Sequence, residues 1–468
     1  MGKGAGKGGH TAAKKEERGG VAPVLQALVA SFTTPKVERP SKARQGDAAP
    51  RNKEGRYTLA QVQTHNTPED SWVIVRGKVY DVTEFAPMHP GGAVINTYAG
   101  KDATDVFTTF HAGSSWAELE RLHIGTCVDP DETAMLKDFR EMRAAMVKAG
   151  LFKPSKGYYV FKVVSLLGTL AASYALAGCF QSWLSVAAAG ALLGLFWQQA
   201  GWLAHDFCHN QVFQDRSLNH AFGLFLGNVL QGFSVSWWKH KHNTHHAAPN
   251  EITGDGHSVD PDIDTLPMFA WSVDQLPTLP ASMRGLVRYQ EYVFLPMLIF
   301  ARLSWCQSSY NHVVGFEGMT TTERRVELAL LAAHHAGFLA APYLLLPAAK
   351  ATALFLLGQF VAGFFLGFVF VQSHNAMEVY SEEKDFVSAQ VHSTRNIHST
   401  VWNDFFTGGL NRQIEHHLFP TLPRHNLGKA AELVKSHCAK HGMVYEDISL
   451  ADGTSKVMER LREVAAAA

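Results

Sequence analysis

The sequence predicts a mainly α fold in which a multi-pass membrane domain with four spanning helices follows a small α+β domain. Its 468 residues exceed one average domain, which favours two or three units. Aliphatic and aromatic residues make up 46% of the chain and charged residues 18%, and the apolar ones are concentrated in long runs. A segment with strand-like patterns precedes those runs. The two kinds of unit are therefore consecutive along the chain.

Net charge and cysteine content narrow the functional classes. Lysine plus arginine equals aspartate plus glutamate at 42 each, so the chain as a whole has no field that would attract nucleic acid. The five cysteines lie far apart without a C-x-x-C pair, which argues against a disulfide framework and against a zinc knuckle. A reducing, cytosol-facing environment and no nucleic-acid partner are expected.

Residues 1–54 are predicted to be a disordered basic leader. They are rich in glycine, alanine, lysine and arginine and show no sustained apolar period. They also lack the apolar core of a secretory signal. An organellar transit peptide stays open, although Glu16, Glu17 and the scarcity of serine weigh against one.

Residues 55–130 have the pattern of a small α+β domain. Two strands are expected at 72–75 and 78–82 around a turn at Arg76 and Gly77, and a short helix is expected at 102–110. Residues 131–157 follow as a charged linker helix, because apolar residues recur there at roughly helical spacing.

Residues 158–450 are predicted to form the membrane domain. Four apolar runs within it are each long enough to cross about 30 Å of hydrocarbon as a helix. Very short connections join the first run to the second and the third to the fourth, so the helices form two hairpins. The runs cover 158–180, 183–204, 326–348 and 351–371.

The topology follows from the hairpins. Two weaker apolar stretches, 221–238 and 292–305, are placed at the membrane interface, because an even number of crossings then leaves all polar segments on one aqueous face. Lysines flank that face, and this bias is typical of the cytosolic side. Residues 451–468 remain as a C-terminal tail. The flanking lysines are Lys153, Lys156, Lys239 and Lys241.

An H-P-G-G motif that begins at His89 is followed by His111 at the end of the expected helix. A haem iron with two axial imidazoles has no open site, which suits one-electron transfer. The glycines would let backbone approach the porphyrin edge. The stretch from Trp72 to His111 resembles the cytochrome b5 family, and the resemblance implies haem b with His89 and His111 as its axial ligands.

Three short clusters hold seven histidines in polar segments of the membrane domain. The first cluster has the spacing H-x-x-x-H, which puts both imidazoles on one helix face, and the second has the spacing H-x-x-H-H. Seven imidazoles are more than one tetrahedral zinc ion uses and suit two imidazole-bound irons. The clusters are His205 and His209, then His242, His245 and His246, and finally His416 and His417.

The three clusters resemble those of the integral-membrane fatty-acid desaturases, and the likeness covers roughly residues 57–450. Gln413 stands where a third histidine of the last cluster might have stood. The resulting Q-x-x-H-H box is similar to that of the front-end branch, which is fused to cytochrome b5. The resemblance implies that the clusters hold two non-haem irons.

That resemblance also implies metal ligands outside the clusters. His374, just beyond the fourth apolar run, is the candidate, and Gln413 or Asn396 could ligate directly or through water. The acidic run 260–264 stays open between a substrate role and a structural loop. No catalytic residue beyond the iron ligands is predicted.

Four further histidines have weaker patterns. His240 and His425 lie close to the clusters and are expected to support them or to lie at the surface. His334 and His335 fall inside the third apolar run, where a polar pair is a functional hypothesis by default. Packing or helix–helix bonding is favoured for this pair, because it lies far along the helix from the metal face.

The resemblance implies a delta-6 front-end desaturase that inserts a cis double bond between an existing double bond and the carboxyl end of a polyunsaturated acyl chain. It implies O₂ as co-substrate and electrons passed through the fused haem from cytochrome b5 reductase. The fatty acyl substrate would be carried on coenzyme A or on a glycerolipid. An endoplasmic reticulum membrane with a cytosolic catalytic face is expected, and a plastid membrane stays open.

Several alternatives share these features. Delta-5 or delta-8 acyl desaturation and long-chain-base desaturation of sphingolipids use similar clusters. Fatty-acid hydroxylation also uses cytochrome b5 and histidine clusters, but the glutamine-led third cluster argues against that reaction. A different class would be a non-enzymatic membrane electron carrier whose clusters bind structural metal.

Overall fold

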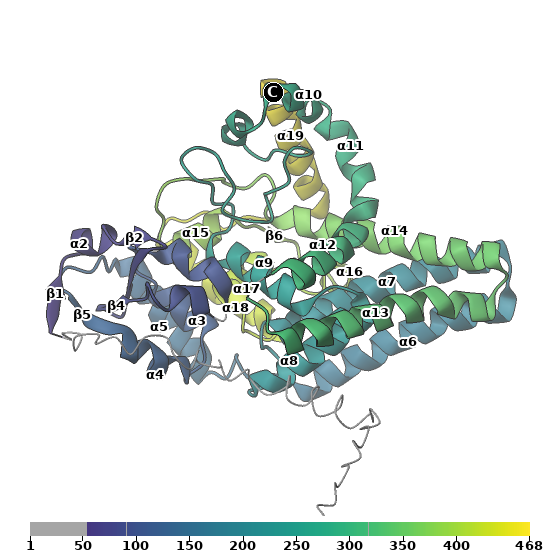
Figure 1. Cartoon of the computed structure of the whole chain (residues 1–468), viewed down its shortest axis with the longest axis horizontal. Coiled ribbons are helices and arrows are strands. Elements are labelled where there is room, and N and C mark those ends of the chain that lie inside the picture. Colours follow the sequence, from purple (N-terminus) through teal and green to yellow (C-terminus); the bar gives the residue numbers. More distant parts are fainter. Residues whose placement is uncertain (1–53, 90, 317) are drawn as a thin grey trace, which may run out of the picture.

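The computed structural model describes residues 54–89, 91–316 and 318–468. The leader expected at 1–54 therefore lies, but for its last residue, outside the described residues. Figure 1 shows the sheet-containing N-terminal domain at one end of the molecule and the long helices extending from the other. Some of the segments that connect and follow these helices lie between the two ends, and others form a third lobe at the top of the view, where the C-terminus lies.

The N-terminal domain is built on a sheet that, over the described residues, has five strands in the order β1-β5-β4-β3-β2. Strands β3 and β4 form the expected antiparallel hairpin, and its turn residues Arg76 and Gly77 have positive φ angles of 53° and 73°. The strands are β1 (Gly55–Tyr57), β2 (Asn66–Thr67), β3 (Asp70–Val75), β4 (Lys78–Asp81) and β5 (His123–Cys127).

Short helices cover this sheet and complete a small apolar core. Val73, Val75 and Tyr80 are buried in it, with Leu119 packed on them from a helix. The helices are α2 (Leu59–Gln63), η1 (Ala86–Met88), η2 (Gly92–Tyr98), α3 (Thr104–Phe110), α4 (Ser115–Leu119) and η3 (Glu120–Leu122).

A linker helix, α5 (Ala134–Lys148), connects the N-terminal domain to the rest of the chain. Its Arg140 forms a bidentate ion pair with the buried Asp105 of α3, at 2.9 and 2.8 Å. On the other side its fully buried Phe139 stacks on Phe419, with ring centroids 5.4 Å apart. The helix therefore fixes α3 against the C-terminal part of the molecule.

The long helices form two antiparallel hairpins. Helices α6 (Lys156–Phe180) and α7 (Trp183–Cys208) are joined at Gln181 and Ser182, and α13 (Thr321–Leu345) is joined to α14 (Ala348–Ser373) across two residues. Helix α7 packs against both α6 and α14 and so lies at the centre of the bundle. Small residues on α7 permit this contact, as is common between membrane helices.

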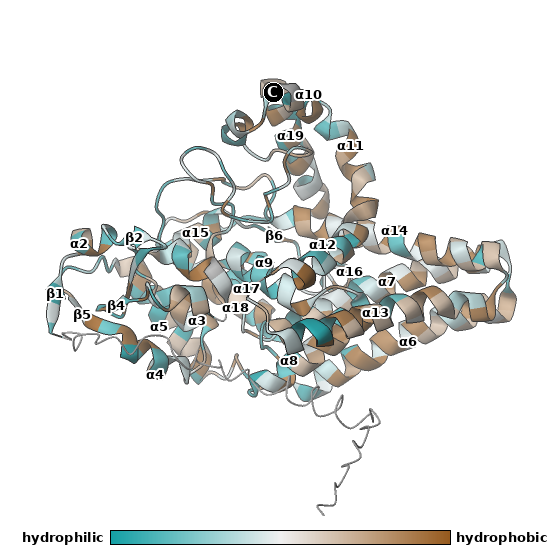
Figure 2. Cartoon of the chain, in the orientation of Figure 1, coloured by the Kyte–Doolittle hydropathy of each residue, from teal (hydrophilic) through white to brown (hydrophobic). Residues whose placement is uncertain are grey.

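Among the described residues, three helices are long and apolar enough to cross a membrane, namely α6, α13 and α14. The fourth expected span, α7, is equally long but is not among them. Its second half carries Gln198, His205 and Asp206, which lower its hydropathy and are buried in the interior of the bundle. In Figure 2 the outer long helices are predominantly brown, as expected for surfaces that face lipid.

The segments between and after the hairpins fold into short helices. The stretch expected at 221–238 is interrupted by the π-helix η4, which ends at Gly232 with a φ of 96°. The elements are α8 (Arg216–Leu224), η4 (Phe225–Gln231), α9 (Val235–Ala247), η5 (Val273–Thr278), α10 (Ala281–Val287), α11 (Gln290–Met297), η6 (Leu298–Phe300), α12 (Ala301–Gly315), α15 (Phe386–His392), β6 (Asn396–Ile397), α16 (Val401–Phe406), α17 (Gln413–Leu418), η7 (Arg424–Asn426), α18 (Leu427–Lys440) and β7 (Asp447–Ile448).

The residues expected as a tail at 451–468 instead form most of a packed helix, α19 (Leu450–Ala467). Val457, Leu461 and Val464 recur at helical spacing and are buried against neighbouring elements. Helix α19 packs on α11 and α14 and pairs Arg462 with Glu291 at 2.9 Å. The segment forms a packed helix because of its amphipathic period, although it lies at the end of the chain.

The contact between α7 and α14 gives a stability prediction. A Cβ at Gly194 would lie 2.6 Å from the Cβ of Val361 on α14, whereas a Cβ at Gly168 on α6 would meet nothing within 4 Å. Gly194→Val should destabilise the protein by about 1–3 kcal/mol through overpacking. Gly168→Val makes the same chemical change on an open face and serves as the control. Thermal unfolding in detergent should show a lower midpoint for Gly194→Val alone, and equal midpoints would contradict this packing.

Candidate functional site

His89 and His111 face each other in the N-terminal domain, with 3.5 Å between their Nε2 atoms. His89 follows η1 and His111 follows α3, so each imidazole is presented by the end of a helix. The Nδ1 of His89 lies 3.2 Å from the carbonyl of Gly92, and that of His111 lies 3.1 Å from the carbonyl of Phe107. With Nδ1–H donating to a carbonyl, each Nε2 keeps its lone pair for a metal.

The surroundings of this pair also suit a haem. Phe107 stacks on His111 with ring centroids 4.2 Å apart, and Phe85 lies edge-on to His89 at 5.9 Å. Burial lowers the pKa of His89, and burial together with the charge of His89 lowers the pKa of His111 to about 4. Both imidazoles are therefore neutral near pH 7, which is the form that ligates iron.

A first group of four buried histidines converges at the end of α7. Each offers one ring nitrogen, and these nitrogens all lie within 4.8 Å of one another. The Nε2 atoms of His205, His209 and His416 have no hydrogen-bond partner among the described residues. The members of this group, called group 1 below, are His205 and His209 of the α7 end, His242 of α9 and His416 of α17.

A second group, called group 2, joins His245 of α9, His374 at the end of α14 and His417 of α17. Their ring nitrogens also lie within 4.8 Å of one another, and all three residues are buried. The Nε2 atoms of His245 and His374 are 3.3 Å apart. His374, which lies outside the three sequence clusters, is thus brought to the same point as two cluster histidines.

Helix geometry explains why adjacent histidines belong to different groups. Successive residues of an α-helix are rotated by about 100°, so neighbours cannot point at the same ion. On α17, His416 faces group 1 and His417 faces group 2. On α9, His242 and His245 are three residues apart and lie on neighbouring sides of the helix, yet they too belong to different groups. Two short helices between the groups therefore contribute to both.

Each imidazole of group 2 is held by a hydrogen bond at Nδ1. His245 Nδ1 lies 2.9 Å from a carboxylate oxygen of the buried Asp260, and His417 Nδ1 lies 2.8 Å from Oε1 of Gln390. His374 Nδ1 lies 3.2 Å from the carbonyl of Ser393. These acceptors select the tautomer with a free Nε2 and fix the ring orientation, as outer partners of metal ligands do.

Gln413 and Asn396 differ in whether their side-chain atoms are free to bind a metal. Gln413 Nε2 lies 2.9 Å from Nε2 of His374, and its Oε1 is buried with no partner in the described ranges, so the amide borders group 2. Asn396 donates to Glu415 and Tyr445 and accepts from the backbone of Ile414. All the polar atoms of Asn396 are thus used in holding α17, and Gln413 is the better candidate of the two.

His246 lies between the groups. Its Nε2 is 3.0 Å from Nε2 of His242, and its ring stacks on that of His417 at 4.1 Å. Burial, with neighbouring imidazoles adding to it, keeps the pKa of His246, His416 and His417 well below the usual value. These three imidazoles are therefore neutral near pH 7, and their lone pairs can bind cations. His245 differs, because burial would lower its pKa but the charges of Asp260 and Asp262 outweigh that effect and raise the pKa.

A buried ion pair links the first and third sequence clusters. Arg424 donates to Asp206 at 2.6 Å and to the carbonyl of Trp202 at 2.7 Å. Asp206 follows His205 directly, and Arg424 begins η7, the short helix that follows α17. This pair fixes the end of α7 relative to the histidines of α17.

The sequence patterns identified all the histidines of both groups but not the side chains that orient them. Asp260 lies in the acidic run that was left open between a substrate role and a structural loop, and its observed contact is with His245. Gln390 and Ser393 carry no recognisable pattern. The buried His334 donates through Nδ1 to Val229 and contacts Arg302 at 2.9 Å, which is the helix–helix bonding favoured for it.

Two family models match this chain. The model described as "Fatty acid desaturase" matches residues 181–449, and the model described as "Cytochrome b5-like Heme/Steroid binding domain" matches residues 58–128. The first match covers more than half of the chain and contains all the histidines of both groups. The second contains His89 and His111.

Curated relatives match most of the chain. A protein named acyl-lipid (9-3)-desaturase from Physcomitrium patens is 48% identical over 89% of this chain and 79% of its own length. A delta(8)-fatty-acid desaturase from Euglena gracilis is 36% identical over 79% and 89%. The delta(6)-fatty-acid desaturase fat-3 from Caenorhabditis elegans is 35% identical over 84% and 95%.

A solved structure matches the N-terminal domain only. Cytochrome b558 of Ectothiorhodospira vacuolata, titled a prokaryotic homologue of cytochrome b5, is 34% identical over 16% of this chain and 98% of its own. The TM-score is 0.15.

The contact between Asp260 and His245 gives a prediction for metal binding. Asp260→Asn removes the negative charge that supports His245, and such changes typically lower metal affinity about 10–100-fold. The variant should lose non-haem iron at lower chelator concentrations than the unmodified protein, with its haem content unchanged. Asp264→Asn, at an exposed position of the same loop, is the control. Equal resistance to chelator in all three proteins would contradict the role of Asp260.

Proposed function

This chain belongs to the fatty acid desaturase family as a front-end member with a fused cytochrome b5 domain, and on that premise we propose delta-6 desaturation of polyunsaturated fatty acyl chains. Membership of this family makes the chain an enzyme, so the alternative of a non-enzymatic electron carrier is wrong. Its cofactors are haem and two non-haem irons, with O₂ as co-substrate.

The convergence of the two buried imidazole groups is the observation that carries the assignment of metal ligands. Group 1 has four ring nitrogens within reach of one ion and group 2 has three. Two separate points of convergence favour one iron at each, with Gln413 beside the second. His246, between the groups, is assigned as a shared or alternate ligand.

When bound, the irons supply the activation of O₂ that removal of hydrogen from an unactivated methylene requires, since no side chain is basic enough for that task. The protein orients and shields the site. Asp260, Gln390 and the Ser393 carbonyl hold protons on the outer ring nitrogens of group 2. Burial of all seven imidazoles excludes bulk water, which prevents side reactions.

The overall reaction balances with two external electrons. The acyl chain loses two hydrogens and becomes a cis alkene, and the haem domain supplies two electrons one at a time. With two protons from solvent, O₂ is reduced to two molecules of water. The haem electrons come from cytochrome b5 reductase in the same membrane, which we assign as the partner.

The position of the new bond rests on the glutamine-led third cluster and on the relatives. Gln413 opens this cluster. The relatives named above are a (9-3)-desaturase, a delta(8)-fatty-acid desaturase and a delta(6)-fatty-acid desaturase. Delta-6 is the proposal, and delta-8, delta-5 and long-chain-base desaturation are the other outcomes of the test.

The one-sided arrangement of the site supports the proposed location. His205 and His209 lie at one end of α7, and His374 directly follows α14. The histidines of α9 and α17 converge with them in groups 1 and 2, so the catalytic groups lie at one end of the bundle. We assign that end to the cytosolic face of the endoplasmic reticulum, where coenzyme A and glycerolipid substrates are both accessible.

Feeding experiments test the reaction. Yeast that expresses this chain and is supplied with 18:2 and 18:3 fatty acids should accumulate products with a new delta-6 double bond, located by mass spectrometry. Time-resolved analysis of lipid classes identifies the carrier, because the pool used by the enzyme acquires the bond first. A delta-8 or delta-5 product would replace the delta-6 assignment, and a hydroxylated product would refute desaturation.

Two histidine variants separate the cofactors. His89→Ala should lose haem and turnover but retain non-haem iron, because its imidazole belongs only to the haem-side pair. His417→Ala should lose non-haem iron and turnover but retain haem, since it belongs to group 2. Iron analysis together with the haem absorbance measures both quantities. Loss of haem in His417→Ala, with non-haem iron intact, would contradict the assignment.

A further inference from the structure

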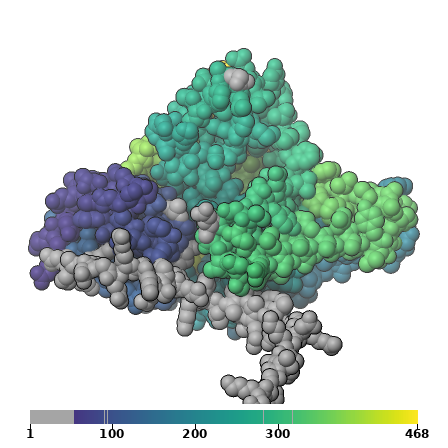
Figure 3. Space-filling view, in the orientation of Figure 1, coloured from purple at the N-terminus to yellow at the C-terminus, as the bar shows by residue number. Residues whose placement is uncertain are grey.

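The haem domain is docked against the second histidine cluster in this structure, and Figure 3 shows it abutting the middle of the chain. We propose that the docked face is the route by which electrons pass from the haem to the metal centres, and that Phe110 is the residue that makes the contact. This inference rests on the proposed function.

Phe110 bridges the two sites. It immediately precedes the haem-side His111 in the chain, and its ring lies edge-on to that of His246 with 6.0 Å between centroids. Its carbonyl accepts a hydrogen bond of 2.8 Å from Arg216 of α8. One peptide linkage and one ring contact therefore separate a haem-side imidazole from the imidazole that lies between groups 1 and 2.

Gly92 and Tyr98 of η2 also contact α9, the helix that carries His246. Tyr98, at the end of η2, donates a hydrogen bond of 3.2 Å to the carbonyl of Ala247, the residue after His246. A Cβ at Gly92 would lie 2.8 Å from Nδ1 of His240 on α9. Gly92 also has a φ of 76°, so both its backbone conformation and the close approach of α9 favour glycine.

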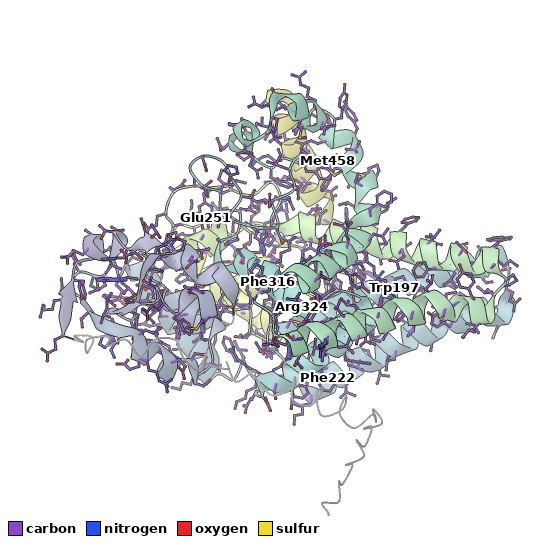
Figure 4. All side chains as sticks on the ribbon, in the orientation of Figure 1. Trp197, Phe222, Glu251, Phe316, Arg324 and Met458 are labelled. Carbon is purple, nitrogen blue, oxygen red and sulfur yellow. The ribbon has the colours of Figure 1, made fainter. Side chains whose placement is uncertain are left out.

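A charged pair completes the docked face. Lys101 of the haem domain lies 3.8 Å from Glu251, which follows α9. Glu251 is labelled in Figure 4 on the side of the membrane domain that faces the haem domain. Phe316, also labelled there, packs on His240 from the end of α12 at 5.0 Å. A hydrogen bond and a charged pair thus accompany the Phe110 contact at the docked face.

The linker helix α5 fixes the position of α3, the helix that precedes His111. The ion pair between Arg140 and Asp105 and the bond from Arg143 to the carbonyl of Thr108 both fix α3, the helix that ends in Phe110. Phe139 of the same linker stacks on Phe419, two residues beyond His417. A short linker packed at both ends keeps the donor at a high effective concentration next to the acceptor.

The redox step uses only reactants already named. In each delivery a reduced haem loses one electron and becomes oxidised, the metal centres gain that electron, and the reductase restores the haem. Two deliveries supply the electrons required for one O₂. No bond is made or broken at Phe110, which acts as a positioning contact between donor and acceptor.

The test uses the full-length protein with its haem and iron. Phe110→Ala should retain haem and accept electrons from the reductase normally, but re-oxidation of its haem after addition of substrate and O₂ should slow at least about tenfold. Phe110→Tyr, which keeps the ring, should largely restore the rate. Stopped-flow absorbance of the haem measures both half-reactions.

Charge reversal gives an independent readout of docking. Lys101→Glu and Glu251→Lys should each slow haem re-oxidation and expose the 240–252 backbone to hydrogen exchange, and the double variant should recover both. Lys78→Glu, whose lysine pairs with Glu120 within the haem domain at 3.0 Å, is the matched control and should leave both quantities unchanged.

The outcomes separate this inference from the proposed function. Unchanged re-oxidation and unchanged exchange in Phe110→Ala and Lys101→Glu, with normal formation of product, would overturn the docked route and leave the desaturase assignment intact. Failure of the unmodified protein to form an unsaturated product would instead overturn the proposed function.

Discussion

Seven imidazoles buried with their ring nitrogens facing one another are the constraint on which the rest of the structure depends. An uncompensated buried polar atom costs about 1–3 kcal/mol, and the Nε2 atoms of His416 and His417 have no hydrogen-bond partner in the described part of the chain. Metal binding removes this cost, so folding and metal affinity are coupled. The rest of the protein offsets the remaining cost of burying these imidazoles. Helix α7 packs at the centre of the bundle, Arg424 pairs with Asp206, and acceptors bind the outer ring nitrogens.

The electron supply is integrated with this site rather than attached loosely to it. Helix α9 carries three cluster histidines and also contacts the haem domain, through His240, His246 and Ala247. The linker α5 packs on α3 at one side and on the loop after α17 at the other. The elements that hold the metals and the elements that hold the electron donor are therefore partly the same, which explains why the two domains meet at one defined face.

Much of this arrangement could be predicted from the sequence because its signals are local. Helical periods and motif spacing identify the hairpins, the haem-side pair and the three clusters. Helix geometry separates His416 from His417, but which group each one joins depends on the rotation of α17 relative to α7 and α14, which no local pattern contains. Asp260 and Gln390 act on histidines 15 and 27 residues away, so their roles appear only after folding. Gln198 and Asp206 lower the hydropathy of α7, and they are buried because that helix is central. Helix α19 could have been recognised from its amphipathic period.

The most direct measurement is a map of iron positions in the purified protein, by anomalous diffraction at the iron absorption edge. The account predicts one peak between His89 and His111 and two further peaks, one within His205, His209, His242 and His416 and the other within His245, His374 and His417. A single non-haem peak, or iron bound away from these histidines, would contradict the assignment of two separate imidazole groups to two irons.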